Sequence, residues 1–307
     1  MEEHEMSESD KKVILTAKDL SKTFSNESVQ QHVLKNLNLS IYQGDFTVIM
    51  GNSGSGKSTL LYAMSGMDRP SLGTITYYTA DEVSGPAAQN EDSKTGKRAV
   101  DQSAKNGTMG ASAGIEISKF SNDQLALFRR NHCGFVFQQN YLNDSMSALD
   151  NVMVSGLLRT KDRKALAEKA KHLLQRVEIG EQDWKKFPTQ LSGGQQQRVA
   201  VVRGVINSPE VLFADEPTGA LNSQNTINVL DILSDLNNEG QSIVMVTHTV
   251  KAAERANRVI YLADGIITSE VDLGPYIGDY KDESNPQKEE AVARHRRLKD
   301  FLADMGW

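Results

Sequence analysis

The sequence predicts an α/β fold built around a mostly parallel sheet. Two nearly continuous apolar runs, VLFAD at 211–215 and SIVMVTH at 242–248, are typical of central parallel strands that are covered on both faces. Helical stretches lie between and after these runs. A third apolar run, DFTVIM at 45–50, leads directly into a glycine-rich loop and then into a helical segment. Together these patterns favour a single α/β core.

Composition and charge are those of an ordinary globular protein. The chain has 307 residues, of which 38% are hydrophobic and 24% are charged, with a net charge of −6 and a pI near 5.6. This balance lacks the basic footprint of a nucleic-acid-binding domain. No segment reaches the roughly 18 uninterrupted apolar residues of a membrane-spanning helix. Residues 1–12 lack the apolar region of a signal peptide, and we expect them to form a flexible N-terminus. The single Cys133 fits a reduced, cytoplasmic setting, as a buried small hydrophobic residue rather than a nucleophile.

The first part of the chain is predicted to be rich in β-strands. Three runs separated by polar turns have this character: VILTAKDL at 13–20, LNLSI at 37–41 and DFTVIM at 45–50. A helix is expected to begin near Lys57 and to end around Gly66. After it, GTITYY at 73–78 predicts a further strand.

The regular pattern disappears at residues 80–114, which are small, polar and mixed in charge. Such a stretch cannot bury enough apolar surface to offset its ordering entropy, so we expect a disordered insertion. It is either a linker without a binding role or an element that binds a partner. Order resumes where Ser121 can cap a short helix. A longer helix is predicted from about Asp162 to Val177. Its apolar face carries Leu166, Ala170, Leu173, Leu174 and Val177.

The end of the chain is predicted to form a helix with an apolar stripe. Beyond Asp272 the sequence is polar and is interrupted by Pro275 and Pro286. The stripe that follows consists of Leu298, Phe301, Leu302 and Met305. It could pack on the rest of the domain. Alternatively, with the arginines and lysine beside it, it could contact a membrane partner or an anionic membrane surface.

A nucleotide-binding loop lies between the strand at 45–50 and the following helix. The string GNSGSGKST fits the pattern G-x-x-x-x-G-K-[ST], and its position between strand and helix makes the match credible. Glycines allow backbone N–H groups to surround phosphates, and the helix N-terminus favours negative charge. Lys57 would contact the β- and γ-phosphates, and Ser58 would offer its hydroxyl to Mg²⁺. We therefore predict a P-loop NTPase core whose ATP-binding residues include Gly51, Asn52, Ser53, Gly54, Ser55, Gly56, Lys57, Ser58 and Thr59.

Two adjacent acids follow the apolar run at 211–215. Asp215 ends that run and can lie near the Mg²⁺ of the same nucleotide. Glu216 would then point toward the γ-phosphate, where it could act as a general base on the attacking water. The sequence thus predicts a metal ligand and a catalytic base in consecutive positions.

The string LSGGQQQRV at 191–199 resembles the signature of the ATP-binding cassette (ABC) ATPases. Ser192 and the two glycines would open a helix whose N–H groups form a second anion site. In this family the signature contacts the γ-phosphate bound to the opposite subunit, so the resemblance implies a head-to-tail dimer. The implied trans contacts are Leu191, Ser192, Gly193, Gly194 and Gln195.

Other motifs support this resemblance, which covers residues 13–271. Gln138 resembles the glutamine that senses Mg²⁺ and the γ-phosphate, and His248 resembles the histidine that contacts the γ-phosphate. Phe24 stands where an aromatic side chain stacks on adenine, with a simple core aromatic as the alternative. The family also implies a small antiparallel β subdomain, in which GTITYY and IEI would form a hairpin around the insertion, and an α-helical signature subdomain. Residues 272–307 would form a C-terminal extension.

Within the family, strings such as HVLKNLNLSIYQGDFTVIM and ADEPTGAL resemble the group of MacB-, LolD- and FtsE-type ATPases. Within this group the sequence most resembles the Bce-type ATPases of Gram-positive bacteria, which are associated with resistance to peptide antibiotics. One departure is Asn222, which replaces the aspartate that helps to couple the two sites of a dimer. An amide keeps hydrogen-bonding capacity without the charge, so we expect tuning of the coupling rather than its loss.

The predicted function is ATP hydrolysis, with ATP and Mg²⁺, that powers a separate membrane permease. We expect a homodimer at the inner face of the cell membrane, acting in export of or resistance to antimicrobial peptides, with no nucleic-acid partner. A lipoprotein- or lipid-releasing module is an alternative. So is a regulatory module that reports to a sensor histidine kinase through the permease. A third alternative is a soluble ABC ATPase acting on DNA or ribosomes.

Overall fold

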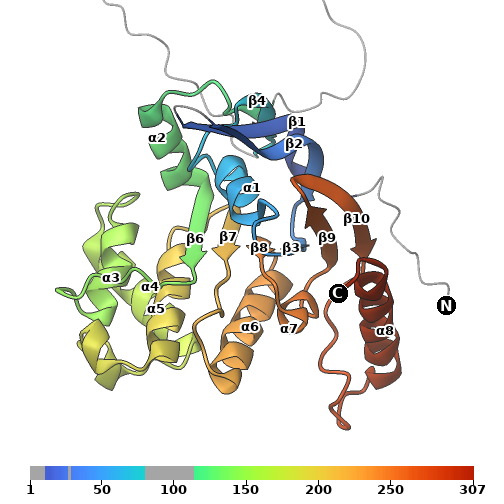
Figure 1. The fold of residues 1–307 in the computed structure, drawn as a ribbon. Helices are drawn as coiled ribbons and strands as arrows, with labels where there is room; N and C mark the ends of the chain where they lie inside the picture. The colour runs from blue at the N-terminus through green and yellow to red at the C-terminus, as the bar shows by residue number, and fades with distance from the viewer. Residues whose placement is uncertain (1–10, 27–28, 80–113) are drawn as a thin grey trace, which may run out of the picture.

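The computed structural model describes residues 11–26, 29–79 and 114–307. Most of the predicted flexible N-terminus and almost all of the predicted insertion at 80–114 lie outside these described residues. The described part of the chain contains two sheets, eight α-helices and two short 3-10 helices, Glu181–Asp183 and Pro188–Gln190. Figure 1 shows one sheet stacked above the other, with a helix between them.

The larger sheet has six strands in the order β10-β9-β3-β8-β7-β6. Its strands are β3 (Phe46–Met50), β6 (Cys133–Phe137), β7 (Val211–Asp215), β8 (Ser242–Val246), β9 (Arg258–Ala263) and β10 (Ile266–Asp272). Strands β9, β3, β8, β7 and β6 run parallel, while β10 pairs antiparallel with β9. The mostly parallel sheet predicted from the apolar runs is confirmed. The carboxyl ends of β3, β7 and β8 lie at one edge, where the predicted site residues begin.

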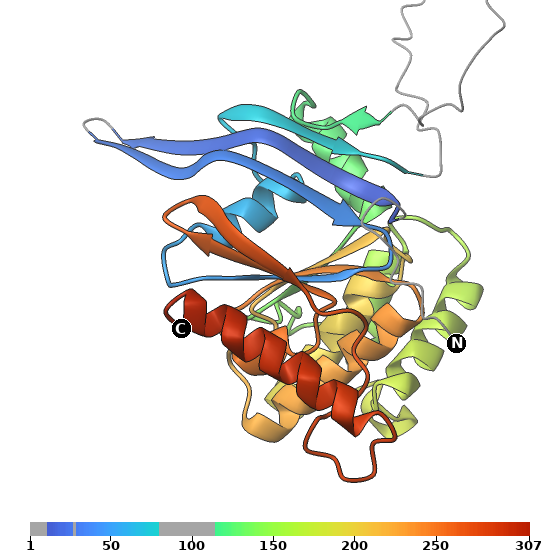
Figure 2. The same cartoon turned by 90° about the vertical axis from the view of Figure 1, so that its right-hand side faces the viewer.

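The smaller sheet is antiparallel, with the order β2-β1-β4-β5. Its strands are β1 (Val13–Asn26), β2 (Val29–Tyr42), β4 (Leu72–Tyr77) and β5 (Ile115–Glu116). β1 continues six residues beyond the predicted 13–20, and with β2 it forms a long hairpin that extends past the rest of the sheet (Figure 2). The predicted pairing across the insertion is present, because Thr76 lies opposite Glu116.

The helices surround the larger sheet on both faces. They are α1 (Lys57–Met64), α2 (Asn122–His132), α3 (Ala148–Gly156), α4 (Arg163–Arg176), α5 (Gly193–Val205), α6 (Ser223–Asn238), α7 (Val250–Ala253) and α8 (Lys288–Asp304). Helix α1 lies between the two sheets, and α3, α4 and α5 gather at one side of the molecule (Figure 1). The cap predicted at Ser121 is present, where Ser121 and Gln124 form a capping box at α2. The helix predicted from about Asp162 is also present, and the side chain of Asp162 caps it.

Successive side chains of the central strands point to opposite faces of the sheet, which divides the core into two layers. In β7, Phe213 packs with α1 and the antiparallel sheet, whereas its neighbour Leu212 packs with the helices on the opposite face. In β8, Val244 and Met245 divide in the same way. Since successive side chains of a strand point to opposite faces, a run that is apolar at every position must be covered on both sides. A third cluster joins α3, α4 and α5.

The terminal helix α8 packs on the rest of the domain, the first of the two alternatives left open by its apolar stripe. Leu298 and Leu302 are buried in the core layer that contains β9, with Phe301 and Met305 beside them. Arg294 is also buried, and its guanidinium donates hydrogen bonds to the carbonyls of Glu254 and Ala256 just after α7. The stripe is therefore occupied by this chain's own core.

Candidate functional site

The nucleotide-binding loop connects β3 to α1 and has a conformation that requires glycine. Gly51 has φ of 150°, and a Cβ there would lie 2.0 Å from the backbone oxygen of Leu262. Gly56, the residue before α1, has φ of 101°, in the left-handed region. The Nζ of Lys57 donates to the carbonyl oxygens of Gly51 and Asn52, both at 2.9 Å. These bonds shape the loop around the lysine ammonium.

A hollow of about 660 Å³ opens above this loop and brings Phe24, Glu216 and His248 together with Lys57 and other residues of the loop, whereas Gly51, Asn52, Ser55 and Asp215 are not part of its lining. Its lining comes from β1, β2, the loop, the start of α1 and the ends of β7 and β8. The lining residues are Phe24, Gln31, Val33, Ser53, Gly54, Gly56, Lys57, Ser58, Thr59, Glu216 and His248. Gln31 and Val33 were not among the predicted residues. Their identity gives no signal by itself, and only the pairing of β2 with β1 brings them to the pocket.

Asp215 is joined to α1 by two hydroxyl groups. The Oγ of Ser58 donates to Oδ1 of Asp215 at 2.9 Å, and the hydroxyl of Tyr62 donates to Oδ2 at 2.6 Å. Burial and the contact with Asp215 raise the pKa of Tyr62 above its usual range, so the phenol remains a donor. Tyr62 was missed by the sequence reasoning. Its spacing of four residues from Ser58 places both on one face of α1, which is the signal that could have found it.

Glu216 and His248 meet across the ends of β7 and β8. The Nδ1 of His248 lies 3.1 Å from Oε2 of Glu216. Glu216 has φ of 44°, an uncommon conformation for a residue with a side chain and one that occurs at functional turns. Burial lowers the pKa of Lys57, while the carboxylates of Glu216 and Asp215 oppose this shift. Lys57 and Glu216 thus share one pocket, and the carboxylate of Asp215 lies close enough to act on the lysine.

The aromatic ring predicted to bind adenine lies at the outer part of the hollow. Phe24 is 45% exposed, on β1, and the Nζ of Lys22 lies 4.9 Å from its ring centroid. Since the ring is not part of the core, the core-aromatic alternative does not fit. A flat, exposed ring next to a phosphate-binding loop is suited to stacking on a base.

The signature residues lie elsewhere, at the N-terminus of α5. Ser192 and Gln195 form a capping box, in which Ser192 Oγ accepts from the Gln195 N–H at 3.2 Å. Leu191 is buried with α3 and α4. Gly194 faces α6, because a Cβ there would lie 2.3 Å from the Oδ1 of Asn225. At Gly193 a Cβ would meet no described atom within 4 Å. None of residues 191–195 lines the hollow that holds Lys57.

Two further predicted residues lie beside the site. Gln138 is exposed just after β6, and its amide group lies over Gly219, where a Cβ would be 2.9 Å from Nε2. It does not line the hollow. Asn222 caps α6, accepting the N–H of Asn225 at 2.9 Å. This capping role is compatible with asparagine as well as aspartate, because both are preferred at N-caps.

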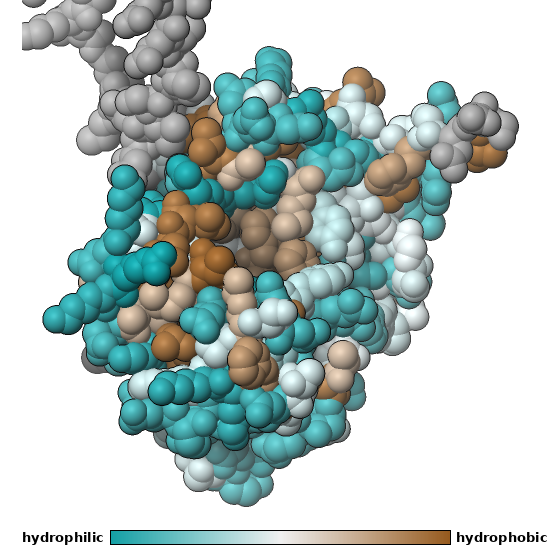
Figure 3. Space-filling view, turned by 90° about the vertical axis from the view of Figure 1, so that its left-hand side faces the viewer, coloured by the Kyte–Doolittle hydropathy of each residue, from teal (hydrophilic) through white to brown (hydrophobic). Residues whose placement is uncertain are grey.

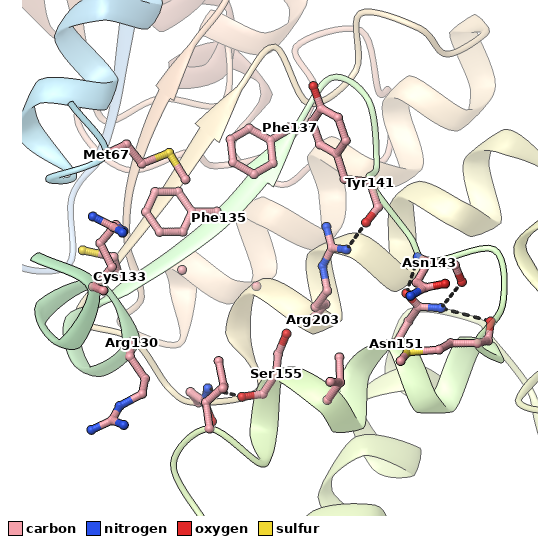
Figure 4. A pocket seen from close by; sticks show the side chains of 18 residues that line it. Met67, Arg130, Cys133, Phe135, Phe137, Tyr141, Asn143, Asn151, Ser155 and Arg203 are labelled. Carbon is pink, nitrogen blue, oxygen red and sulfur yellow. Dashed lines mark hydrogen bonds between the residues drawn. The ribbon is translucent and has the colours of Figure 1, made fainter. Parts of the chain in front are cut away.

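A second hollow, of about 670 Å³, lies on the opposite side of β6 between α2, α3 and α5. Figure 3 shows apolar side chains around this depression, and Figure 4 shows Phe135, Phe137 and Tyr141 along it. The guanidinium of Arg203 donates to the Tyr141 carbonyl at 2.6 Å. Cys133 lines this hollow and is half-buried, whereas the sequence predicted a buried residue. Burial of its thiol nevertheless raises the pKa of Cys133 to about 12, which opposes a nucleophilic role.

The residues present fit a magnesium ion that is held together with nucleotide phosphates. Ser58 Oγ and Asp215 Oδ1 are hard oxygen ligands only 2.9 Å apart. Mg²⁺ in such sites usually takes one or two carboxylates and completes its shell with phosphates and water. Among the described residues there is no cluster of three or more His, Cys, Asp or Glu side chains that could hold a metal alone. Within the same part of the chain, no helix combines the length and apolar character needed to cross a membrane.

Comparisons with known proteins identify relatives over most of the chain. The family model described as ABC transporter matches residues 34–219. An uncharacterized ABC transporter ATP-binding protein of Methanocaldococcus jannaschii is 36% identical over 254 residues, which cover 83% of this chain and 97% of that protein. The macrolide export ATP-binding/permease protein MacB of Escherichia coli is 38% identical over 259 residues. That match covers 84% of this chain but only 34% of MacB.

A solved structure agrees with the fold. The dimeric post-hydrolysis state of an ATP-binding cassette bound to ADP and Pi matches with a TM-score of 0.67 and 32% identity. The match covers 84% of this chain and 98% of that one. It confirms the predicted fold class, a mostly parallel core with an antiparallel β subdomain and helices. The chain belongs to the ABC transporter family, in its MacB-like group, and is an ATPase of the ABC type.

Proposed function

We propose that two copies of this chain bind two ATP molecules head to tail and hydrolyse them to drive a separate permease. The observation that carries the proposal is the separation of the two halves of the site. The hollow of about 660 Å³ holds Lys57, Glu216 and His248, whereas the signature helix begins outside it. The open space around Gly193 leaves that helix N-terminus free to approach a phosphate bound elsewhere. A second copy would supply the missing half of each site.

In this proposal each described contact has a chemical role. Lys57 neutralises charge on the β- and γ-phosphates, and Ser58 and Asp215 hold Mg²⁺, which would stabilise charge on the phosphoryl group. Glu216 accepts a proton from the attacking water as general base. Its contact with His248 at 3.1 Å orients the carboxylate, and the exposed imidazole can reach the γ-phosphate. Phe24 stacks on adenine at the outer end of the hollow.

The second hollow supports a permease as the partner that receives these movements. Its rim presents exposed apolar side chains, including Tyr141, Val154 and Leu158. Arg129 and Arg130 lie among its lining residues and would suit acidic or carbonyl groups on the partner. Exposed apolar surface with a polar rim is typical of a protein–protein contact. The segment that follows Gln138 forms part of this lining, so changes at the γ-phosphate could pass to the partner. Such a complex would lie at the inner face of the membrane.

The substrate assignment rests on resemblance to Bce-type ATPases. We propose that the permease exports antimicrobial peptides, or releases them from their target, and that it could also report to a sensor histidine kinase. Release of lipoproteins or lipids is the second candidate, because the chain's motifs also resemble those of the LolD-type ATPases. Loss of the gene should lower the inhibitory concentration of bacitracin-class peptides. Unchanged peptide sensitivity would contradict this assignment and leave the ATPase assignment intact.

The ATPase and dimer proposals are tested by Glu216→Gln. The variant keeps the shape of the side chain but removes the base, so we expect its hydrolysis rate to fall about 10²–10⁴-fold. ATP would remain bound, and analytical ultracentrifugation should show dimers with ATP and Mg²⁺ but monomers without nucleotide. Glu289→Gln, an exposed change on α8, is the matched control and should behave as wild type. A monomeric Glu216→Gln with wild-type hydrolysis would overturn both proposals.

A further inference from the structure

Tyr62 contacts the predicted catalytic site through the carboxylate of Asp215. It lies one helical turn after Ser58, so the two hydroxyl groups project from the same face of α1. Each of them reaches a different oxygen of the same carboxylate: Ser58 contacts Oδ1 at 2.9 Å and Tyr62 contacts Oδ2 at 2.6 Å. The carboxylate of Asp215 is therefore held at both ends.

The position of Asp215 itself is fixed by the sheet. It is the last residue of β7, paired with Phe137 on one side and with Val246 on the other. The backbone cannot shift without breaking both ladders, but the carboxylate could still rotate about its terminal torsion, which is broad and roughly two-fold. The hydrogen bond from Tyr62 removes this freedom. The ring of Tyr62 is half-buried against the core layer around α1, so the phenol has few positions to adopt.

We propose that Tyr62 is a positioning residue that holds Asp215 with Oδ1 directed at the magnesium site. The inference rests on the proposed function, because it assumes that Ser58 and Asp215 hold Mg²⁺. Without the hydrogen bond from Tyr62, the carboxylate would have to be ordered when the metal ion binds. Here the chain orders it in advance. Partners that orient metal ligands typically change metal affinity 10–100-fold when they are removed.

The test is Tyr62→Phe, which removes the hydroxyl and keeps the ring. Binding of a fluorescent ATP analogue is measured in EDTA and across a Mg²⁺ titration. Binding of Mn²⁺ to the ATP complex is measured in parallel by electron paramagnetic resonance. The matched control is Tyr77→Phe. Its hydroxyl donates to the carbonyl of Met64 at 2.8 Å, at the end of the same helix, so its removal weakens the fold without touching Asp215.

We expect Tyr62→Phe to raise the half-saturating Mg²⁺ and Mn²⁺ concentrations 10–100-fold, with affinity for the nucleotide in EDTA within twofold of wild type. Tyr77→Phe should leave the metal titration unchanged. An unchanged metal titration in Tyr62→Phe would overturn the inference, as would an equal loss of nucleotide affinity in EDTA, which would indicate a general role in folding the loop. A wild-type protein whose nucleotide binding ignores divalent cations would contradict the metal assignment of Ser58 and Asp215, and the role of Tyr62 with it.

Discussion

Asn222 provides a direct test of how local structure supports the site. Its side chain caps α6, accepting the Asn225 N–H at 2.9 Å. Helix α6 buries Val229 and Leu230 against the central sheet, so the loss of a hydrogen bond at its first turn affects the stability of the domain. Asn222→Ala removes the acceptor and should lower the free energy of unfolding by about 1 kcal/mol, within a range of about 0.5–2. For a chain of this size that corresponds to a fall in Tm of about 2–4 °C.

Asn222→Asp separates capping from charge. The carboxylate keeps the acceptor and adds a negative charge at a helix N-terminus, which contributes about 0.3–1 kcal/mol of stability. We therefore expect its Tm to equal or exceed that of wild type, and its ATPase activity to be retained. Thermal and urea unfolding followed by circular dichroism measure both variants, with the exposed Ser223→Ala as control, expected within about 0.5 kcal/mol of wild type. An Asn222→Ala protein as stable as Ser223→Ala would refute the capping role. So would an Asp variant as unstable as the Ala variant.

Three other predictions concern single side chains. The rise in the pKa of Cys133 from 9.0 to about 12 lowers its thiolate fraction at pH 8 about 1000-fold. Alkylation of Cys133 should therefore be slow until the protein unfolds. Rapid alkylation of the native protein would contradict this prediction. Leu298→Ala should lower the free energy of unfolding in urea by about 2–5 kcal/mol, because the side chain is fully buried. The control Lys299→Ala changes an exposed side chain and should leave this free energy unchanged. Equal free energies of unfolding for the two variants would exclude packing of α8. Phe24→Ala should weaken ATP binding by about 1–3 kcal/mol, by analogy with the stacking of bases on aromatic side chains. The affinity for inorganic triphosphate, which has no base, should not change. An equal loss of affinity for both ligands would contradict stacking.

Much of the fold could be predicted because local patterns and tertiary structure agree. The apolar runs at 211–215 and 242–248 are uninterrupted, and only a sheet covered on both faces can use every residue of such a run. The loop before Lys57 predicted both the end of β3 and the start of α1. Ser121 marked a helix N-terminus through its own side chain, which bonds to the adjacent backbone. The spacing of apolar residues predicted the helix that begins after Asp162.

What the sequence did not predict depends on contacts between distant segments. The contact of Tyr62 with Asp215 spans 153 positions and requires α1 to pack beside the end of β7. The apolar stripe of α8 predicted a buried face but not its partner, and the burial of Arg294 runs against the usual preference of arginine for the surface. The identity of the chain that completes each ATP site also depends on a second molecule.

The central claim, that each ATP site is built from two copies, is tested most directly by mixing two inactive variants. Glu216→Gln removes the base from one half of the site. Gly193→Asp places a carboxylate at the signature helix, where the open surroundings should allow normal folding while the charge opposes a phosphate. Each variant alone should hydrolyse ATP poorly in a single-turnover assay. An equal mixture should recover about a quarter of wild-type activity, because half of the dimers are mixed and each of these holds one intact site. A mixture as inactive as its components, or an active Gly193→Asp protein, would contradict the composite site.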